Sequence, residues 1–157
     1  MRIRIIVADQ SEARFYDTAR SGGRLQPAGR MTDPTAHLHD RDLKSDRPGR
    51  TFDRAATGGQ RRGSVAHHAT GGERRPRKIQ AQRFARRIAT ELRKSGRTKS
   101  FDRLVVMAGP PFLGVLREAL PAAVRKVVVA EIRRDLVHQT AAEVRAHMPA
   151  AAFQNED

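Results

Sequence analysis

The strongest constraint on the fold is a run of five apolar residues, Leu104–Ala108, which is typical of a central strand buried on both faces. Gly109–Pro111 follows it, and proline is tolerated in the first turn of a helix, so we expect a helix over Phe112–Leu120 that stops at Pro121. A second apolar run, Lys126–Ile132, predicts another buried strand. Two strands joined by a helix predict a parallel, right-handed β-α-β unit.

The N-terminal residues predict a β-hairpin. Ile3–Ala8 is rich in β-branched residues and is expected to form a mostly buried strand, while Asp9–Glu12 has the composition of a turn. Ala13–Thr18 alternates in polarity and supplies the second strand. Beyond it, Leu25 is expected to begin at most a short edge strand, because breaking residues follow. These are Pro27, Gly29 and Pro34.

The clearest helix is predicted over Ile79–Lys94, and Gly96 is placed to terminate it. Its apolar face is expected to pack on the sheet, and its basic face to point outward. The apolar residues are Ala81, Phe84, Ala85, Ile88 and Leu92, and the basic ones are Arg83, Arg87, Lys94 and Arg97. A capping box over Thr140–Glu143 opens a last helix that runs to about Met148.

Together these elements predict an α/β fold for a single domain over residues 1–157. We expect three layers with a mixed sheet: an N-terminal hairpin, a long basic loop over about residues 41–77, and then helix, strand, helix, strand and helix. The loop is predicted because residues 46–62 lack apolar periodicity and contain the turn dipeptides Pro48-Gly49 and Gly58-Gly59.

The positive charge is concentrated in the middle of the chain. The net charge is +14 and the pI about 11.6, and residues 41–99 hold 18 Lys and Arg against 5 Asp and Glu, a net charge of +13. This pattern is typical of nucleic-acid binding. Arginine suits phosphate oxygens in particular. The predicted nucleic-acid-binding residues are Arg47, Arg50, Arg61, Arg62, Arg83, Arg87 and Lys94.

Several classes of protein and site are not expected. The chain has no cysteine, which excludes disulfides and thiol catalysis. The apolar N-terminal run stops at Ala8, too short for a signal peptide, and no window is long enough to span a membrane, so we expect a cytoplasmic protein. The histidines around His37–His39 and at His67-His68 lack the ordered spacing of metal ligands. We therefore predict no metal site and no cofactor.

The tripeptide Gly58-Gly59-Gln60 is the one candidate for catalysis. An amide and a backbone N–H beside Arg61 and Arg62 are suited to orienting a water and stabilising an oxyanion next to bound phosphates. A chain with 12 glycines can also contain this string by chance, so the sequence leaves open whether the tripeptide is functional or accidental.

Five segments resemble the bacterial host attachment protein family, over nearly the whole chain. They are Asp46–Asp53, Gln82–Ala85, Phe101–Ala108, Phe112–Arg117 and Glu131–Leu136. That family is in turn similar to the middle domain of archaeal and eukaryotic class I release factors and Pelota. The resemblance implies a ribosome, rRNA or tRNA partner and places Gly58-Gly59-Gln60 where release factors carry their Gly-Gly-Gln loop. The family usually has a Gly-x-Gly-Arg-His-Ala-like run where this chain has Thr57–Ser64.

Two functions of different classes follow. The first is a cytoplasmic factor associated with RNA or the ribosome, with peptidyl-tRNA hydrolysis by the loop as an open question. The alternative is a protein related to attachment or interaction, without catalysis, whose basic surface binds acidic proteins or membrane surfaces. The oligomeric state is left open.

Overall fold

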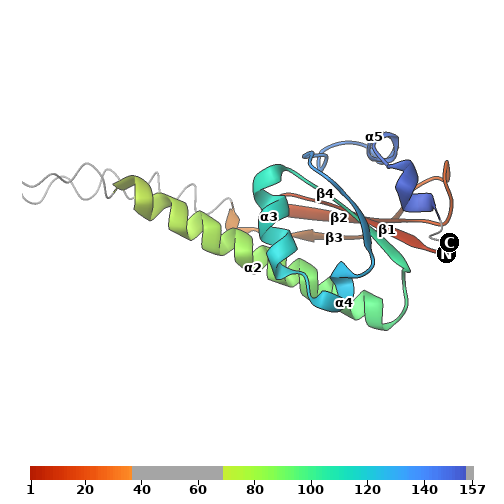
Figure 1. The fold of residues 1–157 in the computed structure, drawn as a ribbon. Coiled ribbons are helices and arrows are strands. Elements are labelled where there is room, and N and C mark those ends of the chain that lie inside the picture. The colour runs from red at the N-terminus through yellow and green to blue at the C-terminus, as the bar shows by residue number, and fades with distance from the viewer. Residues whose placement is uncertain (37–68, 155–157) are drawn as a thin grey trace, which may run out of the picture.

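The protein, described here by a computed structural model over residues 1–36 and 69–154, is built on one five-stranded mixed sheet (Figure 1). The strand order is β3-β2-β1-β4-β5. β1 pairs antiparallel with β2, and β2 with β3, while β1 and β4 as well as β4 and β5 run parallel. The strands are β1 (Ile3–Ala8), β2 (Glu12–Thr18), β3 (Gln26–Thr32), β4 (Arg103–Ala108) and β5 (Val128–Ile132). The predicted α/β class, N-terminal hairpin and parallel unit are confirmed.

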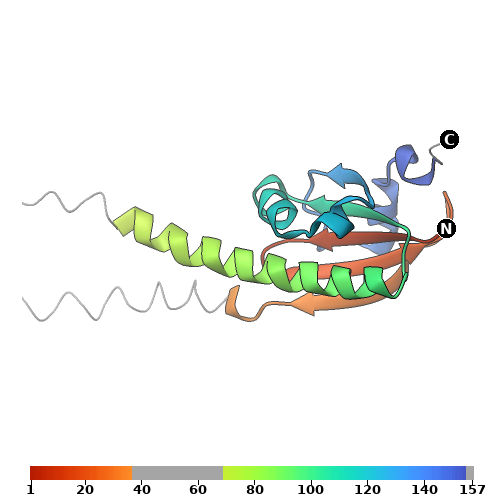
Figure 2. The same cartoon turned by 60° about the horizontal axis from the view of Figure 1, so that its bottom comes forward.

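Helices cover both faces of the sheet and make three layers, as predicted (Figures 1 and 2). One face packs against α2, α3 and α4, and the other against α5, the segment before it and a short 3₁₀ helix. The helices are α2 (Ala69–Arg97), α3 (Pro110–Ala119), α4 (Ala122–Arg125), α5 (Ala141–Ala146) and the 3₁₀ helix η1 (Ala150–Phe153).

The central strands belong to two hydrophobic cores at once. Every residue of β1 is buried, with Ile6 and Ala8 on the α2 side and Ile5 and Val7 on the α5 side. β4 is likewise buried from Leu104 onward. A fully buried Ile or Val side chain contributes about 1.5–3 kcal/mol. The continuous apolar runs therefore mark the strands whose two faces are both covered.

Helix α2 begins at Ala69, ten residues before the predicted start at Ile79. The predicted loop over residues 41–77 is therefore wrong for residues 69–77, which are helical, and Pro76 lies inside the helix. The Arg and Lys residues around this proline are good helix formers. With 29 residues α2 is about 43 Å long. Its first turns extend beyond the sheet (Figures 1 and 2).

The two edge strands also differ from the prediction. β3 has seven residues despite Pro27 and Gly29, because the outer side of an edge strand needs no hydrogen bonds. Gly29 has φ +150°, and the β2–β3 register shifts opposite it, between Phe15 and Tyr16. β5, predicted to be buried, alternates between half-buried and exposed residues because it pairs only with β4.

The predicted capping box of the last helix is confirmed, since Thr140 Oγ1 accepts from Glu143 N at 3.2 Å and Glu143 Oε2 accepts from Thr140 N at 2.7 Å.

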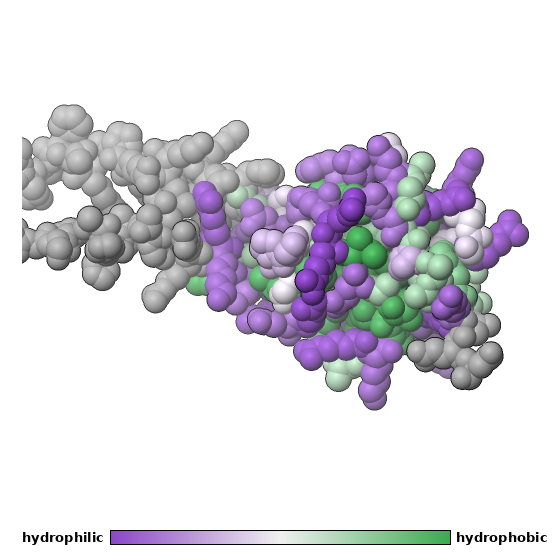
Figure 3. Space-filling model, turned by 45° about the horizontal axis from the view of Figure 1, so that its top comes forward, coloured by the Kyte–Doolittle hydropathy of each residue, from purple (hydrophilic) through white to green (hydrophobic). Residues whose placement is uncertain are grey.

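The surface of the described residues is mainly hydrophilic. Figure 3 shows a face on which hydrophilic side chains surround smaller hydrophobic areas. Large hydrophobic side chains stay exposed at Met1, Ile79 and Val129. Within residues 1–36 and 69–154, no helix has the length and apolarity needed to cross a membrane.

Candidate functional site: a pocket beside a basic helix

A pocket of about 550 Å³ opens at the carboxyl ends of the parallel strands. This is the edge at which α/β sheets usually bind ligands. Its lining comes from the β1–β2 turn, the first half of α2, the start of α3 and the loop after β5. The lining residues are Asp9, Gln10, Ser11, Arg77, Lys78, Ala81, Gly109, Pro111, Phe112, Val115 and Asp135.

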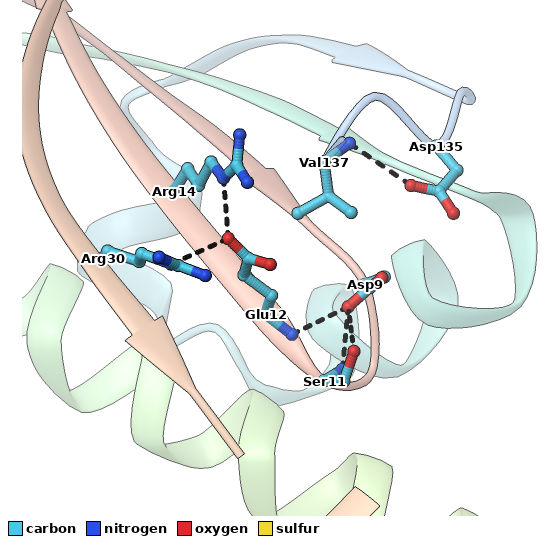
Figure 4. A network of polar contacts seen from close by, with 7 residues as sticks. All are labelled: Asp9, Ser11, Glu12, Arg14, Arg30, Asp135 and Val137. Atoms are coloured by element: carbon cyan, nitrogen blue, oxygen red, sulfur yellow. Dashed lines mark hydrogen bonds and ion pairs between the residues drawn. The ribbon is translucent and has the colours of Figure 1, made fainter. Parts of the chain in front are cut away.

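The β1–β2 turn is held rigid by Asp9. Its Oδ1 accepts hydrogen bonds from Ser11 N (2.8 Å), Ser11 Oγ (2.9 Å) and Glu12 N (2.7 Å) (Figure 4). Its Oδ2 has no hydrogen-bond partner among the described residues. The Ser11 hydroxyl donates to the same oxygen of Asp9 that accepts the two backbone bonds, so this hydroxyl helps to hold the turn in place. The turn therefore offers the pocket one carboxylate oxygen on a preorganised backbone.

Glu12, the first residue of β2, links β2 to β3. Its Oε1 lies 2.6 Å from Arg14 Nε and 2.9 Å from Arg30 Nε (Figure 4). Burial raises the pKa of Glu12, but the hydrogen bonds and charges of Arg14 and Arg30 outweigh it and hold the pKa below its ordinary value. Glu12 is therefore ionised and paired, and it stabilises the scaffold behind the pocket.

A buried glutamine ties α2 to the turn. Gln80 Nε2 donates to the Gln10 carbonyl and to Asp33 Oδ2, each at 2.8 Å, while Asp33 Oδ1 accepts from the Thr35 backbone and hydroxyl. Burial raises the pKa of Asp33, but these hydrogen bonds and the charge of Arg87 lower it by more, so the pKa of Asp33 lies below its ordinary value. This network sets the distance between α2 and the sheet at the pocket.

The opposite wall is largely apolar. Pro111, Phe112 and Val115 come from the first turns of α3, and Ala81 faces them from α2. Because prolines occupy the first two positions of α3, this helix start lacks two of the backbone N–H groups that bind phosphate elsewhere. A phosphate in this pocket has its donors on the α2 side, where Arg77 and Lys78 lie.

Asp135 supplies a second carboxylate from the loop after β5. Figure 4 shows it at the same end of the sheet as Asp9, on a separate loop. Its Oδ1 accepts a long hydrogen bond of 3.3 Å from Val137 N, and the residue is exposed. Among the described residues, neither Asp135 nor Asp9 forms an ion pair, so both carboxylates keep acceptor capacity toward the pocket.

Outside the pocket, α2 presents a basic face. We use this name for five exposed residues at helical spacing, Arg83, Arg86, Arg93, Lys94 and Arg97. Within the part of the chain that the structure describes, none of them has a carboxylate within ion-pair distance. Arg83 and Lys94, two of the predicted nucleic-acid-binding residues, thus lie on one solvent-facing surface.

Arg87, the third predicted helix residue, also has contacts inside the protein. Its Nη1 donates to the Thr32 carbonyl at 3.4 Å, and its guanidinium carbon lies 5.7 Å from the centre of the Phe84 ring. It is exposed but partly serves to fix β3 against α2. The loop candidates Arg47, Arg50, Gly58, Gly59, Gln60, Arg61 and Arg62 lie outside the described residues, so their predicted roles stay predictions.

The pocket residues Asp9, Lys78 and Asp135 are not among the site residues predicted from the sequence. A usable signal was present, because Asp9 directly follows β1 and Asp135 lies three residues after β5. Polar residues just past the ends of parallel strands gather at one edge of a sheet.

Comparison with known proteins identifies the family. No curated protein matches the chain. A solved structure described as "Archaeal protein" is similar at 10% sequence identity and a TM-score of 0.44, with 94% of this chain covered and only 36% of that one, about a third of its length. Residues 4–148 match the family described as "Protein required for attachment to host cells". That match spans most of the 157 residues, and the protein therefore belongs to the host attachment family.

Proposed function

We propose that the protein is a cytoplasmic factor that binds RNA, with the ribosome or tRNA as its partner, through the basic face of α2. One observation carries the proposal: five exposed cations share one helix face without carboxylate partners among the described residues. Cations that are not neutralised within the protein attract the phosphates of a nucleic acid and release its counterions on binding.

The basic face is well placed for a phosphate backbone. From Arg83 to Arg97 it extends about 21 Å along the helix, which brings several phosphates of one strand within reach. Arginine can bind a phosphate with two parallel hydrogen bonds. The opposite side of α2 is anchored by the buried Phe84, Ile88 and Leu92. The cations therefore sit on a rigid element, and binding RNA does not require the helix to become ordered first.

The resemblance of the sequence to release-factor middle domains, which is itself part of this proposal, implies the ribosome as the site of action. In this proposal the requirement for attachment is indirect, since a factor acting in translation affects the production of other proteins. Residues 41–99, which include the basic face, carry a net charge of +13. The excess of positive charge that favours binding to a polyanion therefore extends beyond the basic face in the sequence.

Reversing three charges on the basic face is expected to abolish most of the RNA affinity. In a variant with Arg83→Glu, Lys94→Glu and Arg97→Glu, tRNA should bind on the order of 100-fold more weakly at low salt, and the slope of log K against log salt should fall by about 2 to 3. Arg87 is left unchanged because it also contacts Thr32 and Phe84. Fluorescence anisotropy with labelled tRNA and co-sedimentation with ribosomes measure both quantities.

The matched control carries the same charge change away from α2. Arg20, Arg24 and Arg145 are exposed, on the β2–β3 connection and on α5. Their change to Glu should alter tRNA binding only slightly. Equal loss in both variants, or none in either, would show that the basic face is not the binding surface. If the wild type binds anionic lipid vesicles or an acidic protein but does not bind tRNA, the alternative function in attachment or interaction is favoured instead.

The Gly-Gly-Gln tripeptide is expected to be catalytically silent. We expect no peptidyl-tRNA hydrolysis on programmed ribosomes by the wild type or by Gln60→Ala, because the chain departs from the family's usual run at this place. Release of labelled peptide is the measurement. Hydrolysis by the wild type that falls about a hundredfold in Gln60→Ala would contradict this expectation, since that is the usual loss when a positioned polar group is removed.

A further inference from the structure

We propose that the pocket at the carboxyl ends of the parallel strands binds a guanine nucleotide, with its base on the α3 wall and its phosphate at the α2 cations. Only one source of that nucleotide, an unstacked residue of bound RNA, rests on the proposed function. The other source is a free nucleotide, and the chemistry of recognition is the same for both.

The arrangement of charge orients such a ligand. The cations Arg77 and Lys78 line the α2 side of the pocket, while the carboxylates Asp9 and Asp135 come from the turn after β1 and the loop after β5. A ligand that satisfies both sides is anionic at one end and rich in hydrogen-bond donors at the other. A nucleotide has this polarity, because its phosphate is separated from its base by the ribose.

The size and the apolar wall fit a base. A volume of about 550 Å³ lies within the usual range of ligand pockets, roughly 300–1,000 Å³. Pro111, Phe112 and Val115 form an apolar surface on one side. Unstacked bases bind proteins by contact of their faces with such surfaces and by hydrogen bonds along their edges.

The carboxylate oxygens that are still able to accept hydrogen bonds indicate which base the pocket binds. An ionised carboxylate only accepts hydrogen bonds, and guanine alone among the four bases places two donors, N1–H and the N2 amino group, side by side. Asp135 is exposed, and its only bond among the described residues is the long one from Val137 N, so both oxygens can face this donor pair. Asp9 has a single unused oxygen, Oδ2, which suits one ribose hydroxyl.

Other ligand classes fit less well. Among the described residues, no group of three or more His, Asp or Glu side chains is arranged to hold a metal ion. Two carboxylates at the pocket disfavour a fatty acid or another ligand without donors. The proline-bearing start of α3 disfavours a phosphate on that side and leaves Lys78 and Arg77 to hold it.

Two substitutions separate base recognition from phosphate recognition. We expect GMP to bind the wild type more tightly than AMP, and Asp135→Asn to remove this preference with a loss of about tenfold to a hundredfold for GMP, as for hydrogen bonds to a charged group. Lys78→Ala should weaken GMP binding but leave guanosine binding unchanged. Isothermal titration calorimetry measures these affinities. The matched controls are Asp102→Asn and Lys126→Ala, both exposed at the opposite ends of the strands.

The outcomes distinguish the pocket from the basic face of α2. If GMP does not bind the wild type, or binds Asp135→Asn and Lys78→Ala as tightly as the wild type, the nucleotide pocket is overturned, while RNA binding by the basic face is tested separately. GMP binding with the expected losses supports the pocket even if tRNA binding fails. An RNA hairpin with an unpaired guanosine then identifies the source, because its affinity falls in Asp135→Asn only if the nucleotide belongs to RNA.

Discussion

Replacement of Phe84 by alanine is expected to lower the free energy of unfolding by about 3–5 kcal/mol, a large part of the 5–15 kcal/mol typical of a folded domain. Phe84 is 0% exposed and lies between α2, α3 and the sheet. Its ring centre is 6.1 Å from that of Phe112, and the guanidinium carbon of Arg87 lies 5.7 Å from the centre of the Phe84 ring. The substitution removes the largest side chain that holds the basic helix on the sheet.

Ile79→Ala is the matched control for this change. Ile79 is a large apolar residue on the same helix, but 47% of it is exposed. Its replacement should change the free energy of unfolding by about 0.5 kcal/mol or less, as at most surface positions. Urea denaturation followed by circular dichroism measures both variants. A loss below about 1 kcal/mol for Phe84→Ala, under the low end of core substitutions, would contradict the packing described here.

The sequence was most informative where both faces of a strand are covered. Leu104–Ala108 is apolar throughout and Ile3–Ala8 is apolar except for Arg4, and the strands that these runs form contribute buried residues to both cores. The edge strands were less predictable. Whether Pro27 is tolerated in β3 depends on which side of the strand is unpaired, and this is a property of the sheet order. The same order leaves β5 half exposed.

The start of α2 depended on competing local preferences. Pro76 and the glycines before it disfavour a helix interior, whereas the neighbouring Arg and Lys residues favour one. No apolar periodicity decides between them over residues 69–77, because this part of the helix lies beyond the sheet in Figure 1. The face from Ala81 to Leu92 was predictable because it does pack on the sheet.

The pocket was hidden from the sequence by chain separation. Asp9 and Asp135 are brought to one edge by the placement of β1 beside β4 and of β4 beside β5, and Lys78 reaches the same edge through the packing of α2 on the sheet. Each residue alone is an ordinary polar residue in a turn, helix or loop. The basic face of α2 was easier to predict, since helical spacing by itself puts Arg83 and Lys94 on one side.

The second large effect is expected for Gln80→Leu, which should lower the free energy of unfolding by about 2 kcal/mol at pH 7. Gln80 is 5% exposed and its amide donates to the Gln10 carbonyl and to Asp33 Oδ2. Leucine fills a similar space but leaves both acceptors without this donor. A buried acceptor without its partner costs about 1–3 kcal/mol, and more if it is charged.

The pH dependence of this loss tests its cause. Burial raises the pKa of Asp33, but the hydrogen bonds from Gln80 and Thr35 outweigh this effect and hold the pKa below its ordinary value. A lowered carboxyl pKa contributes stability above the unfolded-state value of about 3.9 and loses it as the pH falls through the folded value. The difference between wild type and Gln80→Leu should therefore be largest near pH 7 and shrink below about pH 4. Gln82→Leu, on the same helix and half-buried, is the control and should show no such dependence. A difference that stays constant from pH 7 to pH 3 would mean that Gln80 acts through packing rather than through the charge of Asp33.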